Sequence, residues 1–149
     1  MHRSVFLVLL LACTTFFALA QTKPDNSSPT KVTGKAKTML GGLEYWDIKE
    51  GTGPAAKLGQ RVTVQYTGWL TNGKKFDSSW DRGGQPFTVQ PLGDAQVIKG
   101  WNEGLVGMKV GGTRQLRIPP ELAYGDRGAG NVIPPNATLI FDIDVVSIQ

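Results

Sequence analysis

The sequence predicts an α+β fold in which an antiparallel sheet curls over one helix. Two stretches, residues 61–70 and 138–148, alternate apolar and polar side chains with the period of two that is typical of half-buried strands. One stretch between them, residues 97–108, carries apolar side chains at helical spacing. Together these patterns favour a sheet whose apolar face is covered by a single helix.

Four segments are expected to form strands. They are residues 43–49, 61–70, 113–118 and 138–148. After the second segment, Asn72 and Gly73 suit the positive φ angles of a hairpin. The last segment gives the clearest pattern, because Asp142 and Asp144 lie opposite one apolar face made of Leu139, Phe141, Ile143 and Val145.

The single helix, expected over residues 97–108, should be short. Its apolar stripe consists of Val97, Ile98, Trp101, Leu105 and Val106. Gly100 and Gly104 lie inside it, and each lowers helix stability by about 1 kcal/mol relative to alanine. We therefore expect a helix that persists because it packs against the sheet.

The first twenty residues have the features of an export signal. Met1-His2-Arg3 is short and basic, residues 5–11 are apolar, and Ala18-Leu19-Ala20 is a small-residue cleavage site. We expect cleavage before Gln21, so that the mature protein is periplasmic or secreted, with no stable membrane insertion. As an alternative, residues 10–13 (LLAC) fit a bacterial lipobox, which would leave a lipidated Cys13.

Residues 21–37 are expected to form a flexible linker between the signal peptide (1–20) and the domain (38–149). The segment is polar and rich in Pro, Ser, Thr and Lys, with almost no apolar residue able to anchor it. Two asparagines, Asn26 and Asn136, fit the glycosylation acceptor pattern, which a eukaryotic secretory host would use.

Composition excludes several kinds of chemistry. Among 149 residues the only histidine is His2 and the only cysteine is Cys13, so the mature chain contains neither. This excludes Ser-His-Asp and Cys-His catalysis, metal sites built on His or Cys, and internal disulfides. Loss of Arg3 lowers the net charge from +4 to about +3, and the scattered basic residues predict no nucleic-acid site. No metal or cofactor is expected, and a monomer is the default state.

Five separated motifs follow one another along the domain. They are residues 66–68 (YTG), 73–79 (GKKFDSS), 97–101 (VIKGW), 122–125 (LAYG) and 133–141 (IPPNATLIF). In this order and approximate spacing they resemble the FKBP-type peptidyl-prolyl cis-trans isomerases, from about residue 40 to the C-terminus. The resemblance implies a five- or six-stranded antiparallel sheet wrapped around one short helix, and isomerisation of X-Pro bonds.

Such a reaction needs no strong nucleophile. Rotation about an X-Pro bond faces a barrier of about 20 kcal/mol because amide resonance must be broken. A catalyst has only to bind the twisted amide more tightly than the planar one. An apolar pocket disfavours the dipolar resonance form, and a few aimed donors hold the displaced carbonyls.

The resemblance also implies the site residues. Those expected to be catalytic are Asp77, Tyr66, Phe141, Trp101 and Tyr124. Those expected to bind substrate are Phe76, Arg82, Phe87, Val97, Ile98, Val132 and Ile133. Without the resemblance, most would be interpreted as core, turn or loop residues. With it, Trp101 forms the pocket floor, and Asp77 orients the site electrostatically, within reach of Tyr66 and Arg82.

Proline-containing polypeptides are the substrates that the resemblance implies, and macrolides such as rapamycin are implied ligands. The alternative is a binding module or holdase that grips proline segments without turnover. Three features depart from the family pattern. The loop 125–131 lacks a histidine that many members have, the stretch from Phe76 to Phe87 is one residue longer, and Gln96 replaces an acidic residue.

Overall fold

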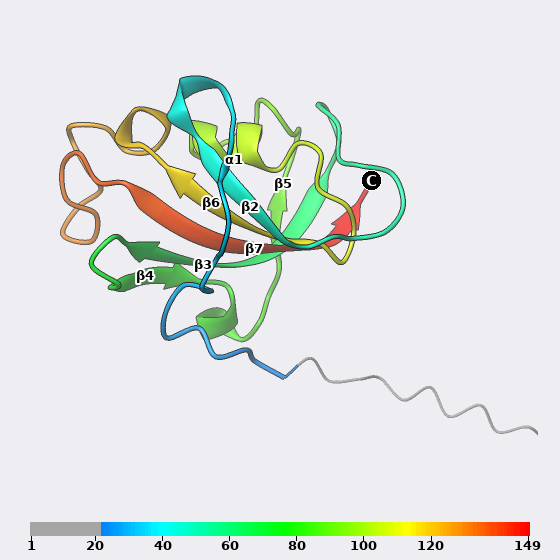
Figure 1. Ribbon diagram of the computed structural model, residues 1–149, viewed down its shortest axis with the longest axis horizontal. Helices are drawn as coiled ribbons and strands as arrows, with labels where there is room; N and C mark the ends of the chain where they lie inside the picture. The colour runs from blue at the N-terminus through cyan, green and yellow to red at the C-terminus, as the bar shows by residue number, and fades with distance from the viewer. Residues whose placement is uncertain (1–21) are drawn as a thin grey trace, which may run out of the picture.

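The computed structural model describes residues 22–149 as a single antiparallel sheet covered by one short helix (Figure 1). The predicted signal peptide, its cleavage site at Gln21 and the lipobox alternative through Cys13 lie outside the described residues. The sheet has seven strands, whereas the family resemblance implied five or six, and its fold class is the one predicted. They are β1 (Lys37–Thr38), β2 (Glu44–Lys49), β3 (Val62–Leu70), β4 (Lys75–Ser78), β5 (Phe87–Val89), β6 (Thr113–Ile118) and β7 (Leu139–Ile148).

The strands follow the order β1-β2-β6-β7-β3-β4, and β5 also pairs with β3. All four predicted strands are present as β2, β3, β6 and β7. The long central pair, β3 and β7, extends from Val62 opposite Ile148 to Leu70 opposite Leu139, with one register shift between Thr63 and Val64. The predicted alternation of β7 is confirmed, because Leu139, Phe141, Ile143 and Val145 are buried while Asp142 and Asp144 lie on the other face. The Asn-Gly turn leads into β4, and there only Gly73 takes a positive φ, of 86°.

The helix α1 (Lys99–Gly104) is shorter than the predicted span of 97–108. Ile98 is extended, with φ −58° and ψ 148°, so the helix begins after it. Beyond the helix, Gly107 takes a φ of 86° in the left-handed region. The two glycines within α1 allow it to lie close against β6, because a Cβ on Gly100 would meet Ile118 Cγ2 at 2.5 Å. The glycines that weaken the helix are thus the ones that let it pack on the sheet.

Three short 3-10 turns complete the described chain. They are η1 (Leu40–Gly42), η2 (Trp80–Arg82) and η3 (Pro120–Leu122). The core between α1 and the sheet is made of branched aliphatic side chains that are almost wholly buried, among them Val62, Val64, Leu105, Leu116, Ile118, Leu139 and Ile143. Because α1 packs on this face of the sheet, aromatic residues from several strands meet α1 on the same face.

Residues 22–36, which we call the N-terminal arm, differ from the flexible linker expected from the sequence. The arm lies against the sheet and crosses it toward β2 (Figure 1). The Thr30 N–H donates to Asp142 Oδ2 at 2.8 Å, the Thr30 carbonyl accepts from Gln115 Nε2 at 2.8 Å, and the Gly34 carbonyl accepts from Trp46 Nε1 at 3.2 Å. Polar contacts hold this segment, whereas the sequence argument considered only apolar anchors.

Candidate active site

Aromatic residues from four strands and α1 surround one cavity of about 210 Å³. Tyr66 comes from β3, Phe76 from β4, Phe87 from β5, Trp101 from α1 and Phe141 from β7. Every residue lining the cavity except Gln96 was predicted to belong to the site; the lining consists of Tyr66, Phe76, Asp77, Phe87, Gln96, Val97, Ile98, Trp101, Tyr124 and Phe141. The structure therefore brings together residues that lie up to 75 positions apart (141 − 66 = 75).

Trp101 is the ring around which the others are arranged. Its centroid lies 4.8 Å from that of Tyr66, 5.8 Å from Phe87 and 5.3 Å from Phe141, each in an edge-to-face arrangement. The side chain is 5% exposed, and its indole nitrogen is buried with no hydrogen-bond partner among residues 22–149. Trp101 thus forms an apolar floor at the base of the cavity.

Gly68 on β3 makes room for a second aromatic pair. The rings of Phe76 and Phe141 stand perpendicular with centroids 5.5 Å apart. A Cβ built on Gly68 would meet Phe141 Cε1 and Phe76 Cζ, both at 2.7 Å, which is closer than real Cβ contacts. The tight wall of the cavity therefore requires glycine here.

Gly68→Ala is expected to displace both rings and to lower both stability and activity. Overpacking of this kind costs about 1–3 kcal/mol of unfolding free energy. Chemical denaturation would measure that loss, and the isomerisation rate of a proline peptide would fall with it. Gly53→Ala is a matched control for a glycine change, since nothing lies within 4 Å of its Cβ position, although its positive φ adds some strain. Unchanged stability and activity in Gly68→Ala would contradict the packing described.

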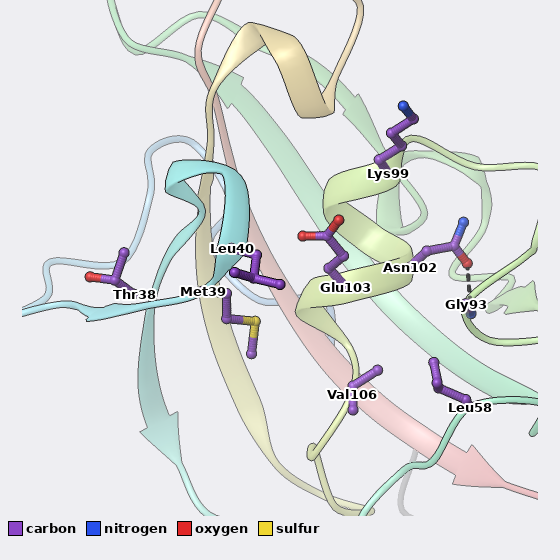
Figure 2. A pocket seen from close by; sticks show the side chains of 9 residues that line it. All are labelled: Thr38, Met39, Leu40, Leu58, Gly93, Lys99, Asn102, Glu103 and Val106. Atoms are coloured by element: carbon purple, nitrogen blue, oxygen red, sulfur yellow. Dashed lines mark hydrogen bonds between the residues drawn. The ribbon is translucent and has the colours of Figure 1, made fainter.

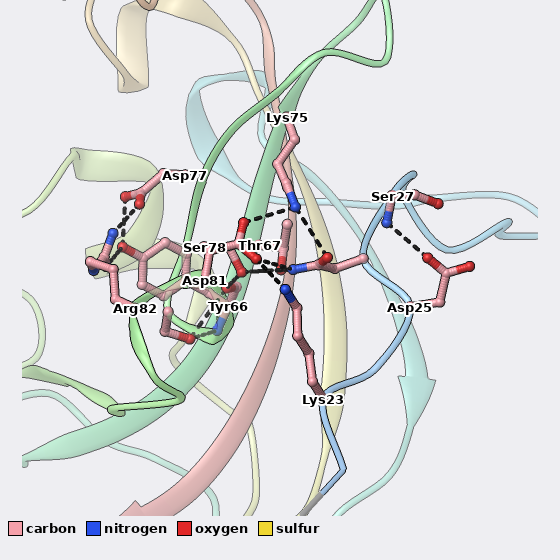
Figure 3. Close-up of polar contacts among 12 residues, drawn as sticks. Lys23, Asp25, Ser27, Tyr66, Thr67, Lys75, Asp77, Ser78, Asp81 and Arg82 are labelled. Atoms are coloured by element: carbon pink, nitrogen blue, oxygen red, sulfur yellow. Dashed lines mark hydrogen bonds and ion pairs between the residues drawn. The ribbon is translucent and has the colours of Figure 1, made fainter.

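A polar triangle forms one edge of the cavity (Figure 3). The Tyr66 hydroxyl donates to Asp77 Oδ2 at 2.7 Å and accepts from Arg82 Nη2 at 2.6 Å. Arg82 Nη1 in turn donates to Asp77 Oδ1 in an ion pair, and the guanidinium lies 5.7 Å from the Tyr66 ring centroid. The predicted contacts of Asp77 with Tyr66 and Arg82 are both present.

These contacts fix the protonation of Tyr66 and Arg82. Burial, together with the hydrogen bond to Asp77, raises the pKa of Tyr66 from 10.0 to about 12. The hydrogen bond to Tyr66 and then that to Asp77 raise the pKa of Arg82. The phenol therefore remains a neutral donor and the guanidinium a cation at physiological pH.

The activity is accordingly expected to be independent of pH between about pH 6 and pH 9. The folded pKa of Tyr66 is raised, so the stability that its neutral form contributes is complete below pH 10.0 and is lost only as pH rises toward about 12. A profile of kcat/KM against pH, measured on a proline peptide, checks this. A bell-shaped profile within that range would contradict the assignment of Tyr66 as a neutral donor and Arg82 as a cation.

The segment before α1 supplies backbone to the cavity. Val97 and Ile98 line it, and the Ile98 N–H makes no backbone hydrogen bond within residues 22–149. Asn102 of α1 fixes the preceding turn, because its Oδ1 accepts from Gly93 N at 2.9 Å and its Nδ2 donates to the Ala95 carbonyl at 2.9 Å. Asn102 was not predicted as a site residue, because its role depends on how the chain folds back from residues 93–95 to α1.

Three predicted site residues are not part of the cavity lining: Arg82, which contacts Tyr66 in the polar triangle, and Val132 and Ile133. Ile133 is 4% exposed and belongs to the core, and its N–H donates to the Ala129 carbonyl at 3.1 Å. Val132 is half exposed, at 50%, on the same loop. Tyr124, also predicted, does line the cavity, and it is 43% exposed at the rim. Gln96 lines the cavity as well, although the sequence marked it only as a departure from the family pattern.

A larger hollow, of about 960 Å³, lies along another side of α1 (Figure 2). Its lining includes the exposed apolar side chains of Leu40 and Leu58 together with Lys99 and Glu103 of α1. None of the residues predicted for the site faces it. Size alone therefore does not locate the chemistry, and the aromatic cavity carries the functional argument.

Within residues 22–149, no group of three or more His, Cys, Asp or Glu side chains is placed to hold a metal ion. In the same range, no helix has the length and apolar character needed to cross a bilayer.

Residues 53–146 match the family model of the FKBP-type peptidyl-prolyl cis-trans isomerases. The chain belongs to this family. It is 57% identical over 109 residues to the FK506-binding protein of Neisseria meningitidis serogroup B, an alignment that covers 73% of this chain and 98% of the relative. The family assignment confirms the resemblance predicted from the five motifs.

Two solved structures share the fold. AtFKBP13 is 44% identical with a TM-score of 0.70, and the match covers 78% of this chain and 100% of that one. A peptidyl-prolyl cis-trans isomerase from Pseudomonas syringae pv. tomato is 36% identical with a TM-score of 0.68, covering 76% and 80%. This chain is accordingly an FKBP-type peptidyl-prolyl isomerase, which favours the enzyme over a non-catalytic proline-binding module.

Proposed function

We propose that the aromatic cavity receives the prolyl ring of an X-Pro segment and catalyses its rotation without covalent chemistry. The observation that carries this proposal is the ring of edge-to-face aromatic contacts around Trp101, which encloses a cavity of about 210 Å³. Such a cavity suits a small apolar ring. It also excludes water from the amide, which disfavours the charge-separated resonance form and so lowers the rotational barrier.

Asp77 acts in this proposal by orienting its neighbours. Both of its carboxylate oxygens already accept hydrogen bonds, Oδ2 from Tyr66 and Oδ1 from Arg82. A carboxylate engaged in this way is a poor general base, and X-Pro rotation requires no proton transfer. Asp77 thus fixes the Tyr66 ring in the wall of the cavity and contributes a fixed field.

Substrate main chain is held at the rim. The Ile98 N–H, which makes no backbone hydrogen bond within the described chain, is the donor for a substrate carbonyl. The hydroxyl of Tyr124, a half-exposed residue of the lining, is a second donor. Val132 and Ile133 lie on the loop that precedes β7 and are proposed to bind substrate there. The Val132 side chain is half exposed on this loop.

The same cavity is proposed to bind FK506-type macrolides, including rapamycin. The support is the name of the Neisseria meningitidis relative, an FK506-binding protein. We further propose that the protein is exported, as residues 1–20 indicate, and that it acts as a monomer on proline-containing polypeptides in the periplasm or outside the cell.

Titration with FK506 during catalysed isomerisation of a Leu-Pro peptide tests the location of the site. We expect one-site inhibition, weakened in Phe87→Ala, which removes one aromatic wall. Leu58→Ala, in the larger hollow, should leave both catalysis and inhibition unchanged. If Leu58→Ala weakened inhibition while Phe87→Ala did not, the assignment of the ligand to the aromatic cavity would be wrong.

A further inference from the structure

Asn26 is a buried polar residue in an otherwise largely exposed N-terminal arm. It is 7% exposed, whereas the residues on either side of it are exposed. Its Nδ2 donates to Ser78 Oγ at 3.0 Å and approaches Thr67 Oγ1 at 3.4 Å, while its Oδ1 accepts from Lys75 Nζ at 3.1 Å. The side chain is thus bonded at both ends to strands β3 and β4.

A charge cluster reinforces this contact (Figure 3). Nζ of Lys23 in the arm lies 2.6 Å from Asp81 Oδ1, and Nζ of Lys75 in β4 lies 2.8 Å from Asp81 Oδ2. Hydrogen bonds from the two lysines hold the pKa of Asp81 well below its usual value. The arm is therefore tied by an ion pair to η2 as well as by hydrogen bonds to β4.

The residues that the arm holds are direct chain neighbours of the polar triangle. Ser78 follows Asp77 on β4, and Asp81 precedes Arg82 on η2. β4 stands at the end of the strand order, where it pairs with β3. The arm therefore contacts the β4–η2 edge at the residues next to Asp77 and Arg82. Movement of this edge would change the contacts of Asp77 and Arg82 with Tyr66.

We propose that Asn26 is a positioning residue of the isomerase site, which keeps the β4–η2 edge in the place where Asp77 and Arg82 both reach Tyr66. This inference rests on the roles proposed above for Asp77 and Arg82. It also has a consequence for Asn26-Ser27-Ser28, which fits a glycosylation acceptor. The acceptor atom would be Asn26 Nδ2, which is buried and engaged, so a glycan there and a docked arm exclude each other.

A double-mutant cycle tests the proposal. Asn26→Ala is expected to lower kcat for a Leu-Pro peptide by about 3- to 10-fold, the loss that corresponds to the net contribution of about one hydrogen bond. KM should change little, because the aromatic cavity is untouched. In an Asp77→Ala background the same substitution should change the rate by less than about 2-fold, because the interaction it supports is already gone. Ser28→Ala, an exposed change in the same arm, is the matched control.

All variants are compared by circular dichroism at the assay temperature, so that rates refer to folded protein. An equal loss of rate from Asn26→Ala in both backgrounds would overturn the proposal, because the arm would then act independently of Asp77. An unchanged rate in the single variant would also overturn it. If Asp77→Ala itself left the rate unchanged, the proposed role of Asp77 would fail instead, which separates the two claims.

Discussion

Asp77→Ala is expected to lower kcat/KM for an X-Pro peptide by about 10- to 100-fold while the protein remains folded. The substitution removes the acceptor of two charge-assisted hydrogen bonds, from Tyr66 and Arg82. Loss of such a bond costs about 1.5–3 kcal/mol, and about 1.4 kcal/mol corresponds to a tenfold change in rate. The Tyr66 ring and the Arg82 guanidinium would both be free to move at the edge of the cavity.

Initial-rate kinetics on a Leu-Pro peptide provide the measurement. Asp126→Ala is the matched control, since Asp126 is exposed on a loop. Tyr66→Phe should give part of the loss, because it removes the hydroxyl but keeps the ring. Full activity in Asp77→Ala would show that the polar triangle is structural and that the aromatic cavity alone carries the reaction.

Trp101→Ala is expected to have the largest effect on stability of any change at the site. The side chain is 5% exposed and contacts three other rings, and truncation of a buried aromatic residue costs about 3–5 kcal/mol of unfolding free energy. The cavity would also lose its floor, so that catalysis and macrolide binding should fall below detection even where the protein remains folded.

Equilibrium denaturation with urea measures the first effect, and binding of FK506 measures the second. Trp101→Phe, which keeps an aromatic floor, should restore much of the stability and part of the binding. A variant with alanine at this position that unfolded at the same urea concentration as the parent, and that bound FK506 equally well, would contradict the arrangement described.

The long strands were predictable because their alternating apolar side chains mark the face that packs on the core. β3 shows this pattern over residues 62–67 and β7 over residues 141–145, and both strands were predicted within one residue of their observed ends. β1 and β5, of two and three residues, are too short to display a period, and they form because neighbouring strands offer them hydrogen-bonding edges. α1 was predicted too long, since local propensity does not show where Ile98 becomes extended.

The cavity was predictable residue by residue only through the family resemblance. In the sequence alone, Trp101 and Phe141 cannot be distinguished from core residues, and the structure indeed shows both buried in it. The geometry adds which of the predicted residues meet: Phe87, next to an insertion in the chain, lies 5.8 Å from Trp101, whereas Ile133 lies in the core. Loop residues depend on tertiary packing that no local pattern encodes.

The N-terminal arm shows a different limit of sequence reasoning. Its polar composition predicts a linker, because chains without apolar residues bury too little surface to fold. Here the anchors are single polar contacts to an existing sheet, such as Asn26 to Ser78 and Thr30 to Asp142. Such contacts depend on which partners the sheet presents, and those partners are 52 and 112 residues away in the chain.

The central claim is that the aromatic cavity accelerates X-Pro rotation, and the most direct measurement is the rate of cis–trans exchange of a Leu-Pro peptide, followed by NMR with and without the purified protein. We expect exchange well above the spontaneous rate, which falls back to that rate when FK506 saturates the protein. Exchange at the spontaneous rate in the presence of folded protein, or acceleration that FK506 does not suppress, would contradict the account.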